Sequence, residues 1–136
     1  MGRRLILDSN VLIAYERGSI DRAAFREDEL SIAAVTLAEY RVGIEMADSV
    51  ERAAARARWL DVILAELDVL DYTRRTADQH ARLIAHTRRA GRPRGAHDLI
   101  IAAHAAETGR AVVSLDARAR FDDLPGVAAL DAAYFC

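Results

Sequence analysis

The chain has 136 residues, of which 52% are hydrophobic and 29% charged, and this composition is that of an ordinary globular protein rather than a disordered or fibrous one. Its formal net charge of −2 excludes binding to polyanions by bulk attraction. All nineteen basic residues are arginines, so mechanisms that need a lysine are excluded, and the single cysteine, Cys136, excludes a disulfide framework or a cysteine-bound zinc within one chain.

Targeting and membrane signals are not found in the sequence. No apolar run approaches the ~20 residues of a membrane span. Only three apolar residues separate Arg4 from Asp8, which is too short a run for the core of a signal peptide. We therefore expect one domain over residues 1–136, in the cytoplasm and with no membrane partner.

Apolar runs and helical periodicity alternate along the chain. We expect strands near residues 4–8, 31–35, 68–71, 111–115 and 127–130, and helices over residues 10–16, 36–47, 49–66, 73–90, 97–108 and 117–121. Local signals support three of the helix ends: a capping box from Thr36 to Glu39, an N-cap at Ser49 and a C-terminal glycine at Gly109. Strands that alternate with helices predict an α/β fold with a short, mostly parallel central sheet covered on both faces, that is, a three-layer α/β/α domain.

Four acids fall where such a sheet would gather them. Asp8 and Asp116 end two apolar strands, whereas Glu39 and Asp98 lie early in two expected helices. The carboxyl ends of parallel strands form the binding crevice of an open sheet. Like charges that converge there repel one another unless a cation lies between them, so the pattern predicts a divalent metal site.

Each of these acids also has a purely structural interpretation. Asp8 and Asp116 can cap the helices that follow them, and Glu39 can complete a capping box with Thr36. Asp98 stands near a helix start, where negative charge is favourable in any case. The metal-site interpretation has the advantage of explaining why all four acids converge at one end of one sheet.

Four segments together resemble the PIN-domain ribonucleases and, among these, the VapC toxins of bacterial toxin–antitoxin pairs. They are LILDSNVLI (5–13), SIAAVTLAE (31–39), HDLIIAAHA (97–105) and VVSLD (112–116), and FDDLPGV (121–127) is similar to the family's usual ending. The resemblance covers nearly the whole chain, in order and at the expected spacing. It implies a PIN-like fold, ribonuclease activity, a second copy of the chain as a partner, and a small antitoxin protein.

The resemblance also assigns roles to individual residues. Asp8, Glu39 and Asp98 match the three acids that the family uses around Mg²⁺ or Mn²⁺, and Asp116 matches a fourth, more variable acid. Small polar positions that support the site correspond to Ser9, Asn10 and Ser114. Independently, a set of hard oxygen ligands suits Mg²⁺ or Mn²⁺ better than zinc or copper. Such an ion can activate a water to hydrolyse an RNA phosphodiester.

The segment from residue 74 to residue 94 carries seven arginines against one acid, Asp78. Positive charge beside an acidic crevice is what docking of a phosphate backbone requires, although a solvated helix face explains the same pattern. The loop arginines Arg92 and Arg94, together with His97, are our candidates for substrate contacts. At His97 the sequence departs from the family, in which relatives often carry Asn or another small polar residue.

Two other kinds of function fit part of the sequence. A phosphatase of the haloacid dehalogenase type needs a second Asp two residues after the first, where this chain has Asn10, and usually a lysine. A catalytically silent PIN-like interaction module is the main alternative, although degenerate sites tend to lose acids and all four acids are present. We therefore expect a Mg²⁺- or Mn²⁺-dependent endoribonuclease that acts as a toxin.

Overall fold

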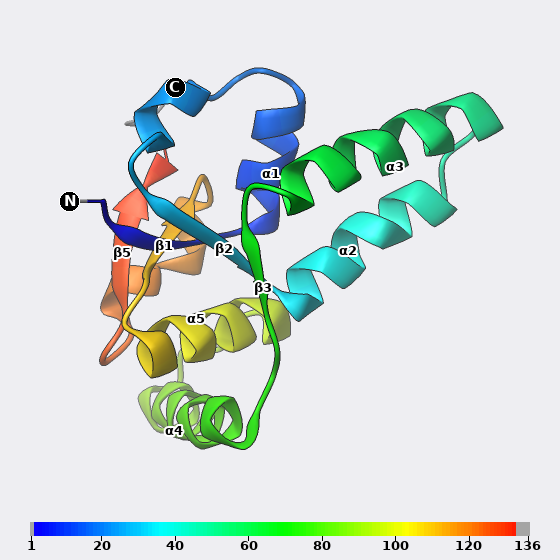
Figure 1. Cartoon of the computed structure of the whole chain (residues 1–136). Helices are drawn as coiled ribbons and strands as arrows, with labels where there is room; N and C mark the ends of the chain where they lie inside the picture. Colours follow the sequence, from blue (N-terminus) through cyan, green and yellow to red (C-terminus); the bar gives the residue numbers. More distant parts are fainter. Residues whose placement is uncertain (1, 133–136) are drawn as a thin grey trace.

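The computed structural model describes residues 2–132, so that Cys136 lies outside the described residues. Figure 1 shows the order of the elements along the chain, which are β1 (Arg4–Leu7), α1 (Ser9–Glu16), the 3-10 helix η1 (Arg22–Phe25), β2 (Glu29–Ala33), α2 (Ala34–Glu45), α3 (Val50–Leu64), β3 (Asp68–Leu70), α4 (Arg74–Ala90), α5 (Ala96–Thr108), β4 (Ala111–Ser114), the 3-10 helices η2 (Ala117–Ala119) and η3 (Phe121–Asp123), and β5 (Ala128–Asp131).

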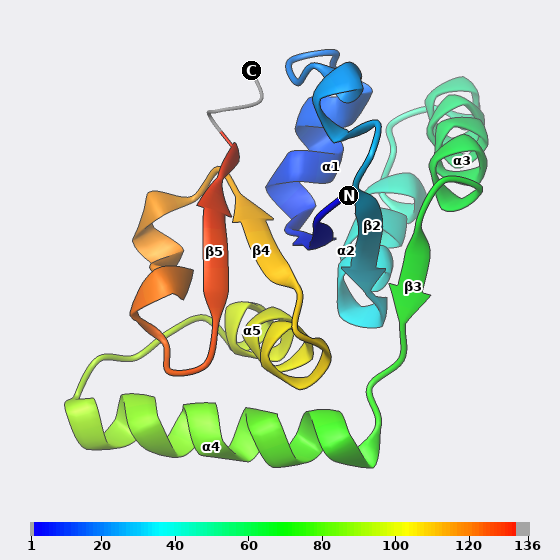
Figure 2. The ribbon, with the colours of Figure 1, turned by 60° about the vertical axis from the view of Figure 1, so that its left-hand side comes forward.

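The sheet has five strands in the order β3-β2-β1-β4-β5, and every neighbouring pair is parallel. Helices α1 and α3 lie toward one face and α4 and α5 cover the other (Figures 1 and 2). The expected three-layer α/β/α architecture is therefore confirmed.

Alternating side chains of the strands build two separate cores. Leu5 and Leu7 of β1 pack in the cluster that contains Leu60 and Ile63 of α3, whereas Ile6 packs in the cluster formed with α4 and α5. Successive residues of a strand point to opposite faces, so a strand buried on both faces needs apolar residues at every position. This requirement explains the uninterrupted apolar runs in the sequence.

The direction in which the chain adds strands to the sheet reverses at β1. From β1 the chain adds β2 and then β3 on one side, and later places β4 and β5 on the other. Ligands of open parallel sheets bind outside the carboxyl ends of the strands at such a switch point. The fold thus directs attention to the gap between the ends of β1 and β4.

The capping box expected at Thr36–Glu39 is wrong. Helix α2 begins at Ala34, directly after β2, and its N-cap Ala33 makes no side-chain cap bond. Thr36 is fully buried in the first turn, so tertiary packing overrides the local cap signal here. A capping box forms instead between Thr73 and Thr76 at the start of α4.

The other helix-end signals are confirmed. Ser49 Oγ accepts a hydrogen bond from the backbone N–H of Arg52, which caps α3. Gly109 ends α5 in the left-handed conformation, with φ of 68°. Within residues 2–132, no helix is both long enough and apolar enough to cross a membrane.

Candidate metal centre

Asp8 stands at the end of β1 and is the N-cap of α1. Its side chain is buried, and both carboxylate oxygens are held. Oδ1 accepts from the backbone N–H of Ser9 at 2.8 Å, and Oδ2 accepts from Ser114 Oγ at 2.9 Å. Hydrogen bonds to both oxygens hold this carboxylate in a fixed orientation.

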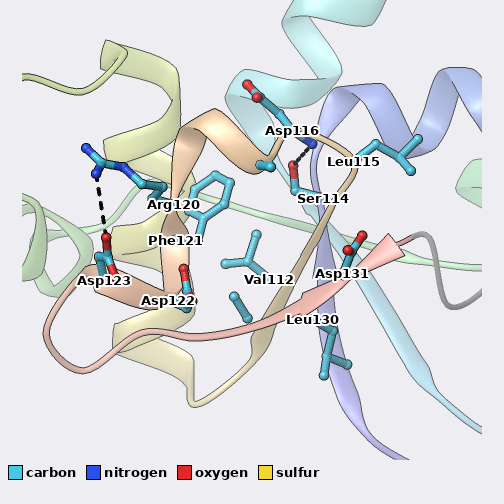
Figure 3. Close-up of a pocket in the computed structure, with 12 residues that line it drawn as sticks. Val112, Ser114, Leu115, Asp116, Arg120, Phe121, Asp122, Asp123, Leu130 and Asp131 are labelled. Atoms are coloured by element: carbon cyan, nitrogen blue, oxygen red, sulfur yellow. Dashed lines mark hydrogen bonds and ion pairs between the residues drawn. The ribbon is translucent and has the colours of Figure 1, made fainter.

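Asn10 and Ser114 connect the ends of β1 and β4. Ser114 Oγ accepts from the backbone N–H of Asp116 at 3.0 Å and from Asn10 Nδ2 at 3.3 Å, and the first of these bonds is drawn in Figure 3. Asn10 Oδ1 accepts from the backbone N–H of Leu115 at 3.0 Å. The two side chains therefore tie the segment that carries Asp116 to the segment that carries Asp8, and their support of a metal site stays a prediction.

Asp98 lies in the first turn of α5 and is half-buried. Its pKa is raised above the usual value of 3.8, first by burial and then by the negative charges of Asp8, Asp116 and Glu39. The other three expected acids therefore lie close enough to act electrostatically on Asp98. Close packing also surrounds this carboxylate, because a Cβ atom at Gly95 would lie only 3.1 Å from Asp98 Oδ2.

Glu39 enters the same region from α2. Its Oε1 is buried and accepts no hydrogen bond, although His97 Nδ1 lies 3.0 Å away. His97 neutralises Glu39 only when its ring is protonated, and its own side chain is 53% exposed. A buried carboxylate oxygen without a donor is costly unless a cation approaches it.

Asp116 is exposed and caps η2, with Oδ1 accepting from the backbone N–H of Arg118 at 2.9 Å. The structural interpretation of Asp8 and Asp116 as helix caps is therefore confirmed, and their role as metal ligands stays a prediction. The cap bond to Asp116 engages Oδ1.

A cavity of about 570 Å³ opens beside Asp116, between β4, β5 and the 3-10 helices (Figure 3). Asp122, Asp123 and Asp131 line it together with apolar side chains of Val112, Phe121 and Leu130. Arg120 is the one arginine among the lining residues, and its Nη1 lies 3.9 Å from Asp123 Oδ2. This cavity extends the negative surface of the carboxyl ends of the strands.

Arg94 lies in a different setting from the one expected of a substrate contact. Its Nη1 donates to the backbone carbonyls of Ala119 and Arg120, and the second bond measures 2.8 Å. Arg120 has a φ of 43°, in the region that favours glycine, so Arg94 ties the loop before α5 to a strained turn after Asp116. Arg92 is exposed. Substrate contact by Arg92, Arg94 and His97 stays a prediction.

Sequence reasoning missed the structural roles of Gly95 and Arg94. A glycine three residues before an acid was the available signal for the close approach of the backbone to Asp98. No local sequence pattern predicts the contact of Arg94 with residues 119 and 120, because the partners are separated by 25 and 26 positions.

The fold and the acidic crevice define the class to which this protein belongs. Residues 5–127 match the family described as PIN domain. Because the match spans most of the sequence, the chain belongs to the PIN domain family.

Individual relatives are similar over most of their length. The chain is 36% identical over 111 residues to "Ribonuclease VapC5" of Mycobacterium tuberculosis, covering 82% of each chain. It is 30% identical to "tRNA(fMet)-specific endonuclease VapC" of Shigella flexneri, covering 85% of this chain and 88% of the relative.

Solved structures agree with these similarities. DNA-bound VapBC of Salmonella typhimurium superposes with a TM-score of 0.81 at 28% identity, covering 97% of this chain and 99% of that one. VapBC-5 of Mycobacterium tuberculosis gives a TM-score of 0.74 at 32% identity, covering 94% and 96%.

Proposed function

We propose that this protein is a divalent-metal-dependent endoribonuclease and the toxin of a toxin–antitoxin pair. The observation that carries the proposal is the electrostatic environment of Asp98, whose pKa is raised by burial and by three further carboxylates from β1, α2 and the segment after β4. A stable protein gathers like charges in this way at functional sites. The relatives named ribonuclease and endonuclease support the same activity.

The residues of the crevice fit Mg²⁺ or Mn²⁺. The donor atoms are hard oxygens, and Glu39 Oε1 is a buried oxygen that lacks a hydrogen-bond donor. As positioned in residues 2–132, no three acidic, histidine or cysteine side chains are grouped closely enough to enclose an ion. Mg²⁺ does not need such a group, because it usually retains several waters and binds through one or two carboxylates and substrate phosphate oxygens.

The roles of the side chains follow from their environments. Asp8 is the best-oriented candidate ligand, because Ser9 and Ser114 fix its carboxylate. Asp98 and Glu39 supply further charge from two helices, and Asp116 completes the site directly or through water. When bound, the metal would supply an activated water and neutralise charge on the phosphodiester. Because water is the attacking group, hydrolysis needs no covalent nucleophile from the protein.

An antitoxin and a second copy of the chain are the proposed protein partners. The VapBC structures similar to this chain support the first. Tyr40 is buried in the core and Trp59, which is partly buried, packs against it, so neither marks a partner surface. Exposed apolar side chains occur on the hairpin of α2 and α3, which extends from the sheet in Figure 1, and they are Val42, Met46, Val50 and Val62.

We further assign residues 1–136 to one PIN-like domain that acts in the cytoplasm, where cellular RNA is the available substrate. A silent interaction module is the second candidate function. The observation that favours it is the spread of the acids, since no three metal-binding side chains of the described region form a group. Cleavage and metal binding distinguish the two candidates.

The test is cleavage of total cellular RNA by the purified protein in Mg²⁺, in Mn²⁺ and in chelator, beside Asp8→Asn. We expect cuts at a few discrete sites that need metal and disappear in Asp8→Asn, while circular dichroism shows an intact fold. Asp61→Asn, an exposed position on α3, is the matched control and should retain cleavage. Cleavage that persists in Asp8→Asn contradicts the site, and a folded protein that neither cleaves RNA nor binds Mn²⁺ supports the silent module.

A further inference from the structure

The outer surface of α4 carries a row of arginines that the proposed chemistry does not use. Arg75, Arg82 and Arg89 recur every seven residues, and all three are exposed. Seven residues are nearly two helical turns, so the three side chains lie in one line along the helix. We call these three residues the arginine line.

The three arginines of the line form no ion pair within the described residues, whereas several other arginines of the protein are paired with acids. Arg3, Arg22 and Arg110 are paired with Asp28, Glu66 and Glu29. In the part of the chain that the structure describes, no member of the arginine line forms an ion pair or a side-chain hydrogen bond. Helix α4 carries five arginines against a single acid, Asp78, which stands between Arg75 and Arg82. A protein with net charge −2 therefore has an excess of positive charge on one helix.

The direction of α4 connects the arginine line to the acidic crevice. Thr76 near the start of α4 donates to Glu107 near the end of α5 at 2.7 Å, so the first turn of α4 lies against the last turns of α5. Residues 91–95 join the end of α4 to the start of α5, where Asp98 is found (Figure 2), and Arg88 of α4 lines a hollow together with Leu99 of α5. From Arg89 to Arg75 the line then extends about 21 Å away from the crevice.

We propose that the arginine line binds the phosphate backbone of an RNA strand that extends beyond the cleavage crevice. This inference rests on the proposed ribonuclease function and adds a docking surface to it. The crevice is negatively charged and repels RNA until metal is bound, so affinity for the strand must come from positive charge elsewhere. Arginine is suited to this role because its guanidinium pairs with phosphate oxygens in two parallel hydrogen bonds.

A second copy of the chain is a less suitable occupant of this surface. In a symmetric dimer the same patch meets itself, which would bring one arginine line against another. Like charges directly opposed are destabilising. An RNA backbone offers the complementary charge along the whole line.

The experiment measures binding of a labelled single-stranded oligouridylate, long enough to span α4, over a series of salt concentrations. Chelator prevents cleavage, so the full-length protein is used without an active-site substitution. The test variant combines Arg75→Gln, Arg82→Gln and Arg89→Gln, and glutamine keeps the helix propensity close to that of arginine. The control combines Arg17→Gln, Arg26→Gln and Arg58→Gln, three exposed arginines on other elements, with the same change in net charge.

We expect the slope of log affinity against log salt concentration to fall in magnitude by about 2 for the test variant, since each phosphate contact with a single strand contributes about 0.7. Affinity should fall at least ~10-fold at low salt, and the control should match the wild type. Equal slopes for the test variant and the wild type would overturn the proposal, as would a changed oligomeric state with unchanged RNA binding.

The two proposals fail in different ways. If the wild type cleaves RNA with metal but the test variant keeps the full salt slope, the docking surface is wrong and the ribonuclease function stands. If the slope falls as expected but the wild type cleaves no RNA, the docking surface stands and the ribonuclease function is overturned.

Discussion

The acids at the two ends of the central sheet have opposite electrostatic environments. At the amino ends of the strands, Asp28 accepts from Arg3 Nε at 3.1 Å and from Nη2 at 2.7 Å, and Glu29 lies 3.2 Å from Arg110. The hydrogen bonds from Arg3 lower the pKa of Asp28. At the carboxyl ends, within residues 2–132, no arginine side chain pairs with Asp8, Glu39, Asp98 or Asp116, and the pKa of Asp98 is raised.

This difference separates stability from proposed function within one small fold. Arginine is abundant enough to neutralise both ends, yet the described acids of the crevice are left to repel one another. Proteins keep such unfavourable arrangements where a ligand or a reaction requires them. Substitutions at the two ends should therefore change stability with opposite sign, and only those at the carboxyl end should change metal binding.

The largest effect after loss of Asp8 itself is expected at Ser114. Ser114→Ala removes the donor to Asp8 Oδ2 and leaves the backbone N–H of Asp116 without its acceptor. Loss of a group that orients a metal ligand typically lowers metal affinity about 10- to 100-fold. Calorimetric titration of the purified variant and of the wild type with Mn²⁺ measures this change in affinity.

Ser31→Ala is the matched control, because Ser31 is also a buried strand serine but donates to the carbonyl of Leu5, away from the crevice. It should lower stability and leave the affinity for Mn²⁺ unchanged. Equal losses of affinity in both variants would mean that Ser114 acts through general stability and not through Asp8.

A smaller effect of opposite sign is expected for Asp98→Asn. Because the pKa of Asp98 is raised in the folded state, the folded state binds more protons than the unfolded one. The contribution of Asp98 to the free energy of unfolding is therefore most favourable below pH 3.8, and it is lost as the pH rises through the raised pKa. Near neutral pH, therefore, removing the charge should raise the Tm of the metal-free protein by a few degrees.

Thermal unfolding with and without Mn²⁺ measures this prediction. Added Mn²⁺ should stabilise the wild type more than it stabilises Asp98→Asn, since an ion stabilises only the folded state that binds it. A metal-free variant that is less stable than the wild type would show that Asp98 serves the fold rather than the site.

The smallest effect is expected at the other end of the sheet. Asp28→Asn should lower the free energy of unfolding by about 1 kcal/mol, because it breaks charge-assisted bonds to a half-exposed arginine. The pKa of Asp28 is lowered in the folded state, so this stabilisation is present above pH 3.8 and is lost as the pH falls below it.

Urea unfolding at several pH values tests Asp28→Asn against the wild type. The difference between the two should vanish in acid, and the affinity for Mn²⁺ should be the same in both. A difference that persists undiminished at low pH would exclude the ion pair with Arg3 as its source.

The sequence by itself determined the strands, the layers and the positions of the acids. Strands such as β1 and β4 are buried on both faces, and that condition forces apolar runs that are legible without any structure. Because the acids follow directly after such runs or open helices, their convergence at one end of the sheet was also predictable.

Only the tertiary structure decided which polar side chains hold the site together. The sequence predicts Thr36 as a helix cap, but α2 begins directly at the end of β2 and Thr36 lies inside its first turn. Arg94 became a link to the carbonyls of Ala119 and Arg120, and Ser114 became the shared partner of Asp8 and Asp116. Those contacts join residues distant in the chain, and their formation depends on distances that only the packed sheet and helices fix.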